Sequence, residues 1–152
     1  MSAAAGLALL TLIAQVESAG QTRVLLLNDC PKGLKGFYAP MRNRIGLCRN
    51  THDINSELNS TLLHEAMHRL QHCRQPELAD QLEIEHSVSA LEEEARALEQ
   101  LGEQDLSTAM SWLRRQLRDH CKNNPILPTA HGEEQSSSPS TNRSENNGPL
   151  LI

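Results

Sequence analysis

The segment His64-Glu65-Ala66-Met67-His68 constrains this chain more than any other feature, because its spacing suits an α-helix that binds a metal ion. A helix turns once in about 3.6 residues, so His64 and His68 lie on one face, about 6 Å apart along the axis. Two imidazoles at that spacing can bind one tetrahedral ion, and Glu65 lies beside them as a prospective general base. The pattern is the sequence form of a zinc-peptidase site. The alternative is a charged, solvent-exposed helix face.

The residues around this motif predict a half-buried helix, which disfavours the solvent-exposed alternative. Apolar side chains recur every four residues and would bury one stripe beside the histidines: Ile54, Leu58, Leu62, Ala66 and Leu70. Asn55 is the expected N-cap, with Ile54 packing against the first turn as a staple. Pro76 is expected to end the helix soon after Arg74.

The first twenty residues are apolar but contain no basic start, since Arg23 is the first Lys or Arg in the chain. The apolar run from Gly6 to Ala14 is too short to span a bilayer. We therefore expect a packed N-terminal helix ending near Gly20, with a cleaved signal peptide as the alternative.

The remaining patterns predict an α+β domain over residues 1–122, with a small sheet of about three strands. Residues 22–27 form an apolar run that ends in turn residues, and residues 36–40 and 44–48 have the spacing of a hairpin. Two further helices are expected over 77–101, with Gly102 as its stop, and over 106–121. From Asn123 the chain is rich in Asn, Pro, Ser and Glu, which predicts a disordered tail over 123–152.

Net charge and cysteine content bear on the partners and the cellular compartment of the protein. A net charge of −5 without any Lys/Arg run argues against a nucleic-acid partner. The four cysteines, Cys30, Cys48, Cys73 and Cys121, contain no Cys-x-x-Cys pair, so they are either free thiols or two disulfides in one of three pairings. Cytoplasmic location is favoured, with an oxidising compartment as the alternative. The oligomeric state is not determined.

Two histidines do not complete a catalytic zinc site, which usually has three protein ligands and one open position. His72 is about 12 Å along the helix from His64, too far to share an ion with it. The metzincin pattern is also excluded by the residues that follow His68. The third ligand should therefore be a carboxylate of the next helix, as in the gluzincins.

Three consecutive glutamates compete for this role. Glu93 should be solvated, because it lies opposite the apolar stripe of its helix. Glu94 is favoured over Glu92, because its neighbours at helical spacing are apolar: Ala90, Leu91, Ala97, Leu98 and Leu101.

Segments outside the motif resemble one family, the mitochondrial ATP-synthase-processing zinc metallopeptidases of the intermembrane space, of which the chain looks like a shortened, divergent member. The resemblance covers about Val24 to Leu98. It rests on Gly36-Phe37-Tyr38-Ala39-Pro40, Cys48-Arg49-Asn50, Cys73-Arg74 and Glu94-Ala95-Arg96-Ala97. The chain departs from the family at Gln71, where an acidic residue is usual.

This resemblance implies a minimal zincin-like fold and a polypeptide substrate extended along the strand from Ile45 to Cys48. Cys73 points away from the zinc face, so it is a packing or disulfide residue. A Cys48–Cys73 bridge would join that strand to the motif helix, and two buried thiols are the alternative.

The expected function is a zinc-dependent endopeptidase in which His64, His68 and Glu94 bind Zn²⁺ and Glu65 moves the proton. Tyr38 and His86 are candidate oxyanion donors, each with a structural role as the alternative. Two other functions remain open. One is a zinc-binding assembly factor or chaperone with little or no peptidase activity, and the other is a purely structural helical domain.

Overall fold

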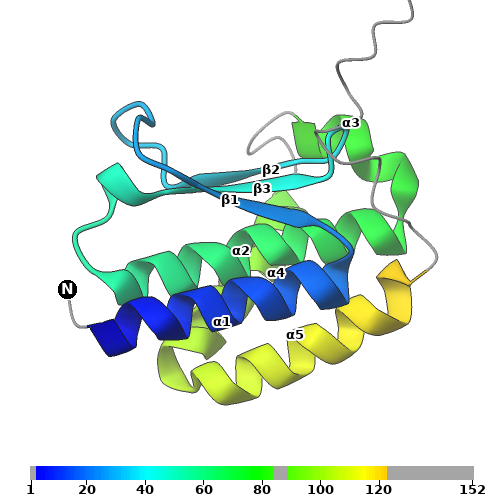
Figure 1. The fold of residues 1–152 in the computed structure, drawn as a ribbon. Helices are drawn as coiled ribbons and strands as arrows, with labels where there is room; N and C mark the ends of the chain where they lie inside the picture. The colour runs from blue at the N-terminus through cyan, green and yellow to red at the C-terminus, as the bar shows by residue number, and fades with distance from the viewer. Residues whose placement is uncertain (1–2, 84–88, 123–152) are drawn as a thin grey trace, which may run out of the picture.

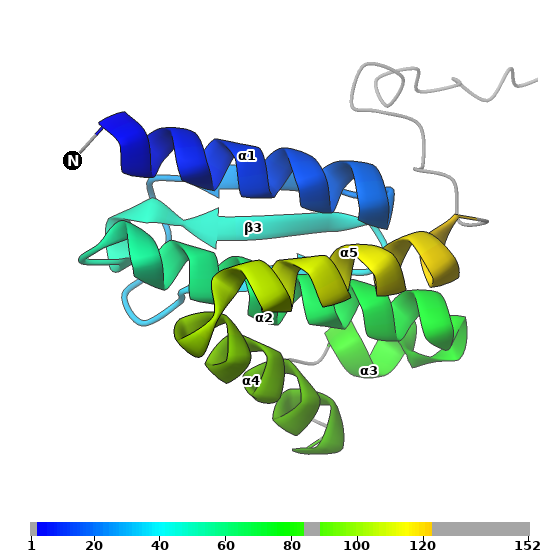
Figure 2. The same cartoon turned by 90° about the horizontal axis from the view of Figure 1, so that it is seen from below.

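The computed structural model describes residues 3–83 and 89–122, which form an α+β domain with the layout expected from the sequence. Its elements, in chain order, are α1 (Ala3–Gly20), β1 (Arg23–Leu27), β2 (Gly36–Ala39), β3 (Arg44–Cys48), the 3-10 helix η1 (Arg49–Thr51), α2 (Asn55–Arg74), the 3-10 helix η2 (Pro76–Leu78), α3 (Ala79–Glu83), α4 (Ser89–Gln104) and α5 (Leu106–Cys121). The sheet covers one side of α1 and α2 (Figure 1), and α5 packs on their other side (Figure 2). The predicted tail over 123–152 lies outside the described residues.

The sheet has the strand order β1-β3-β2, with β1 parallel and β2 antiparallel to β3. The predicted hairpin is therefore confirmed. Ile45, Leu47 and Cys48 are completely buried, because β3 is the central strand. The expectation that a substrate adds to β3 is wrong, since both of its edges are already paired and only β1 and β2 offer an outer edge.

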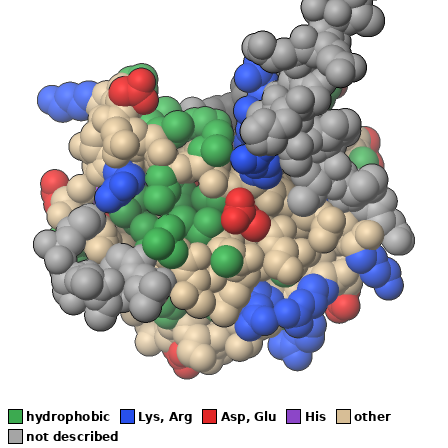
Figure 3. All heavy atoms as spheres, in the orientation of Figure 1, with side chains coloured by type: hydrophobic (Ala, Val, Ile, Leu, Met, Phe, Trp, Pro, Cys, Tyr) green, Lys and Arg blue, Asp and Glu red, His purple; other side chains and the backbone are tan. Residues whose placement is uncertain are grey.

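The outer edge of β1 is partly blocked by α1. The Glu17 carboxylate accepts a hydrogen bond from the backbone N–H of Val24 at 3.1 Å. All five β1 residues are half-buried, and apolar side chains gather on this face of the molecule, where β1 crosses above α1 and α2 (Figure 3). The outer edge of β1 is therefore not fully free for an added strand.

The motif helix α2 buries the predicted stripe, with Leu58, Leu62, Ala66 and Leu70 at most 2% exposed. Its start differs from the expectation: Asn55 is the first helical residue and Ile54 is the N-cap. Ile54 is 59% exposed, so the expected staple is not formed. Instead the Glu57 carboxylate accepts the backbone N–H of Asp53 at 3.1 Å, which satisfies a donor before the first turn.

The predicted N-terminal helix is confirmed as α1, whose buried residues include Leu9, Ile13, Val16 and Ala19. Arg69 of α2 donates from Nε to the carbonyl of Gly20 at 2.8 Å and from Nη2 to that of Gln21 at 3.4 Å. This buried guanidinium thus satisfies carbonyls at the C-terminal end of α1. Within the described part of the chain, no helix is both long and apolar enough to cross a membrane.

The region predicted as one helix over 77–101 is divided. It contains η2, α3 and α4, and residues 84–88 between α3 and α4 lie outside the described part. Gly102 does not end α4, which continues to Gln104. A Cβ at Gly102 would lie only 2.1 Å from Leu63 Cδ1, so this glycine lets α4 pack closely against α2. The helix predicted over 106–121 is confirmed as α5.

Two disulfides link the four cysteines, Cys30–Cys48 and Cys73–Cys121. Both alternatives for Cys48 and Cys73, a bridge between them and two buried thiols, are wrong, because each forms a disulfide with another cysteine. Cys48 joins the loop after β1 to the end of β3, while Cys73 joins the last turn of α2 to the last residue of α5. Both bonds are compatible with an oxidising compartment.

Candidate metal centre

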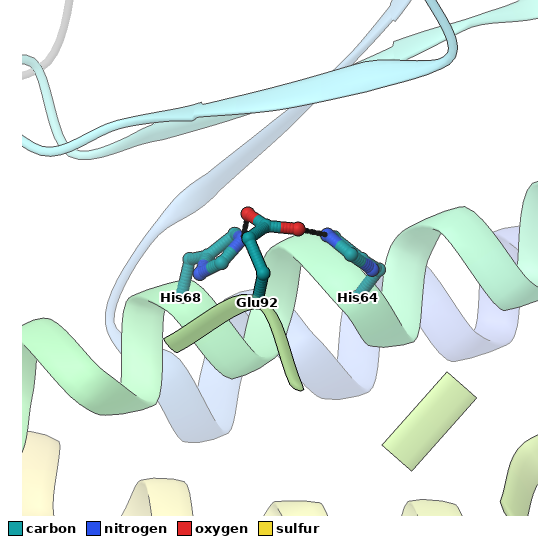
Figure 4. Close-up of side chains that lie close together, drawn as sticks. All are labelled: His64, His68 and Glu92. Carbon is teal, nitrogen blue, oxygen red and sulfur yellow. Dashed lines mark ion pairs between the residues drawn. The ribbon is translucent and has the colours of Figure 1, made fainter. Parts of the chain in front are cut away.

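Two histidines and one glutamate meet where α4 crosses α2. Glu92 lies between the two imidazoles, with Oε2 3.2 Å from His64 Nε2 and Oε1 3.0 Å from His68 Nε2 (Figure 4). The side chains of His64, His68 and Glu92 are 16%, 10% and 11% exposed. One nitrogen or oxygen atom from each residue lies within 4.8 Å of the others, which is close enough to bind one metal ion.

The hydrogen bonds of Gln71 show which nitrogen of His68 carries its proton. Gln71 donates from Nε2 to the carbonyl of Leu91 at 2.9 Å, so its Oε1 is the atom that faces His68. This oxygen can only accept, and it lies 2.8 Å from His68 Nδ1. Nδ1 of His68 is therefore the donor to Gln71, and Nε2, on the side of Glu92, is the ring nitrogen available to a metal ion.

The same argument applies to His64. Its Nδ1 lies 2.9 Å from Oε2 of Glu99, a carboxylate acceptor, so Nε2, on the side of Glu92, is the ring nitrogen available to a metal ion. Burial lowers the pKa of His68 below its ordinary value of 6.5, which favours the neutral ring near neutral pH. Two imidazole nitrogens and one carboxylate thus converge in a donor set that is compatible with a bound metal ion.

Glu94, favoured from the sequence as third ligand, lies outside this cluster. Its side chain is 45% exposed and accepts hydrogen bonds from Gln71 Nε2 at 3.0 Å and Arg74 Nη1 at 3.4 Å. Ala90 and Ala97, which were expected to bury it, are exposed. α4 directs Glu92, and not Glu94, towards the imidazoles, so Glu92 is the carboxylate that this geometry makes available as a third ligand. Glu93 is exposed, as predicted.

Glu65 lines a cleft beside this cluster. The cleft has a volume of about 480 Å³ and is lined by Gly33, Leu34, Lys35, Gly36, Thr61, His64, Glu65 and Glu99. Glu65 itself is only 8% exposed. A Cβ at Gly36 would lie 2.6 Å from Thr61 Cγ2 and 3.4 Å from Glu65 Cγ, so β2 lies directly against the motif helix. The outer strand, the acid and one histidine thus share a single cleft.

Tyr38 and His72 form a separate pair. The Tyr38 hydroxyl lies 2.7 Å from His72 Nδ1 and accepts a hydrogen bond from Arg69 Nη1 at 3.3 Å. Burial, with a smaller contribution from the charge of Arg69, lowers the pKa of His72. Tyr38 is 5% exposed, which favours the structural alternative for it. His86, the other candidate donor, lies outside the described residues.

Two residues of the site were not predicted, Glu99 and Gln71. Each contacts the Nδ1 atom of one histidine. Gln71 follows His68 by three residues, a spacing at which helical side chains meet, so it could have been found from the sequence. Glu99 could not, because its contact depends on how α4 is placed against α2.

A histidine pair on one helix, a glutamate from a crossing helix and an acid in the adjoining cleft are together typical of a metallopeptidase. The chain belongs to the Peptidase M76 family, whose model matches residues 6–124. No curated protein and no solved structure matches the chain. The family match covers more of the chain than the resemblance over residues 24–98 and is consistent with it. Membership of a peptidase family implies a polypeptide substrate.

Proposed function

We propose that this protein is a zinc-dependent endopeptidase in which His64, His68 and Glu92 bind the metal and Glu65 is the general base. The observation that supports the proposal is the convergence of two imidazole Nε2 atoms and one carboxylate, with the Nδ1 atom of each ring contacted by a second side chain. Two histidines and a glutamate leave one position of a tetrahedral zinc ion open for water or substrate. Imidazole nitrogens and a carboxylate oxygen are donor atoms that zinc commonly takes in proteins.

A zinc ion bound by these residues supplies Lewis acidity, which acidifies water and polarises the scissile carbonyl. Glu65 lies beside His64 in the cleft and accepts a proton from the attacking water. At the same time the water oxygen forms a bond to the carbonyl carbon. Glu65 then delivers this proton to the leaving nitrogen as the C–N bond breaks. The products are a carboxylate and a free amine. The low exposure of Glu65 limits competing hydration of its carboxylate.

We place the substrate along β2 rather than β3. Cys48 donates its backbone N–H to the carbonyl of Lys35, so Lys35 faces β3. Because backbone groups alternate along a strand, those of Gly36 face away from β3, towards the outer edge. Gly36 also lines the cleft that contains Glu65. An extended peptide added to this edge would pass the proposed base and metal ligands.

Zinc content and peptide cleavage test this function together. Purified wild-type protein should contain about one zinc per chain, and the His64→Ala/His68→Ala variant should contain little. Glu65→Gln should retain zinc and lose cleavage of an unstructured peptide library. Glu93→Gln is the matched control, since it removes an exposed glutamate of α4. Folded wild-type protein without zinc affinity, or cleavage that persists in Glu65→Gln, would contradict the proposal.

A further inference from the structure

We propose that Glu99 and Gln71 are positioning residues that hold the two metal-binding imidazoles, Glu99 acting on His64 and Gln71 on His68. The inference rests on the proposed function, since it concerns the same metal site. A ligating histidine commonly donates its second ring N–H to a carboxylate, carbonyl or water, which sets the ring orientation and its basicity. Here both of these partners are side chains, and they differ in charge.

Glu99 is placed for this role by α4. It follows Glu92 by seven residues, close to two helical turns, so both carboxylates lie on one face of the helix. Glu92 reaches Nε2 of His64 at 3.2 Å and Glu99 reaches Nδ1 of the same ring at 2.9 Å. The imidazole is therefore contacted through both nitrogens by one face of α4. A flip of the ring about its Cβ–Cγ bond would replace both nitrogens by carbons at these contacts.

Gln71 holds His68 through a longer chain of hydrogen bonds. It accepts from His68 Nδ1 at 2.8 Å and donates to Glu94 Oε1 at 3.0 Å. Glu94 in turn accepts from Arg74 Nη1 at 3.4 Å. Gln71 is only 3% exposed, and its amide also donates to the Leu91 carbonyl, so its orientation is determined by α4. Glu94 thus supports the site indirectly.

The two supports differ in strength. A carboxylate stabilises the N–H of a metal-bound imidazole more than a neutral amide does, because a charge-assisted hydrogen bond is roughly twice as strong. The Glu99 carboxylate is 32% exposed, whereas Gln71 is buried. His64 therefore receives a charged support at the rim of the cleft, and His68 a neutral support inside the helix pair. Zinc affinity should depend on both.

The test compares zinc affinities measured by competition with a chromogenic chelator. Glu99→Ala removes the partner of His64 and should weaken binding by about 10- to 100-fold. Glu99→Gln retains an acceptor and removes the charge, so its loss should be smaller than that of Glu99→Ala. Gln71→Met keeps the length of the side chain without the acceptor and should weaken binding about 10-fold. Glu93→Gln, which changes the same charge on the exposed face of α4, should bind like wild type.

A readout of ring orientation separates positioning from folding. The visible absorption of the cobalt(II)-substituted protein should change in Glu99→Ala and return towards the wild-type spectrum in Glu99→Gln, with unchanged helical circular dichroism in both. Should Glu99→Ala not fold, Glu99→Gln and Gln71→Met decide the question. Zinc affinity equal to wild type in all three variants overturns this proposal alone. Wild-type protein that binds no zinc overturns the proposed function as well.

Discussion

His68 Nε2 lies 3.0 Å from Oε1 of Glu92, across the point where α4 passes over α2. The pairing joins two helices that contribute nothing to the sheet, so the proposed metal site is made by helix packing alone. It also distinguishes two glutamates that are only two residues apart. The partner of the histidine is on the buried side of α4, and Glu94 is on its exposed side.

The first prediction follows from this difference. Glu92→Gln should weaken zinc binding by about 100-fold or more, because Glu92 is proposed to bind the metal directly. Loss of a residue that only contacts a metal ligand costs at most about 100-fold in affinity. The loss of zinc affinity in Glu94→Gln should be at least about tenfold smaller, because Glu94 contacts the site only through Gln71. Chelator competition measures both. A larger loss in Glu94→Gln than in Glu92→Gln would restore Glu94 as the ligand.

The metal-free protein should lose stability as the pH falls below 6.5. The pKa values of His68 and His72 are lowered in the folded protein, mainly by burial. Below the unfolded value of about 6.5 the unfolded chain therefore binds more protons than the folded chain, and acid favours unfolding. Above it this contribution is constant. Thermal unfolding in chelator between pH 7.5 and 5.5 tests the sign, and a flat or rising Tm on acidification would contradict it.

Gly36→Ala should destabilise the protein by about 1–3 kcal/mol, the usual cost of overpacking. The added Cβ would lie 2.6 Å from Thr61 Cγ2 and 2.8 Å from the Gly46 carbonyl, so β2 would move away from α2. Denaturant unfolding measures the loss. Adding Thr61→Ser removes Cγ2 and keeps the hydroxyl that contacts His52, so the double variant should recover part of the stability. No recovery would show that the strand is not limited by Thr61.

The two disulfides should contribute unequally to stability. Cys73–Cys121 spans 48 residues and Cys30–Cys48 spans 18, so loop-closure entropy predicts losses of about 4 and 3 kcal/mol. The paired Cys→Ala variants, compared by urea unfolding, test this order. The larger effect should come from the bridge that ties α2 to α5. A greater loss for Cys30–Cys48 would mean that native packing, rather than loop length, sets the contribution.

Much of the local structure was predictable because it depends on neighbouring residues. The four-residue apolar repeat of α2, the hairpin over residues 36–48 and the limits of α5 were all inferred from short-range patterns, and the structure confirms them. The spacing of His64 and His68 likewise follows from the helical turn. The start of α2 was misjudged, since Asn55 lies inside the helix and Ile54 caps it. The helix predicted over 77–101 was also wrong, since it is divided and its last part continues past Gly102.

What the sequence alone could not determine is how separate elements are turned towards one another. Periodicity tells which residues of α4 share a face, but a helix residue differs from the next by about 100° around the axis, so choosing Glu92 or Glu94 requires the orientation of α4 on α2. That orientation depends on contacts between distant residues, such as the close approach of Gly102 to Leu63. The disulfide pairs, the outer position of β2 and the contact of Glu99 with His64 are long-range in the same sense. The sequence by itself determined the two histidines and their acid; tertiary packing decided which glutamate faces them, because only packing sets the rotation of one helix against another.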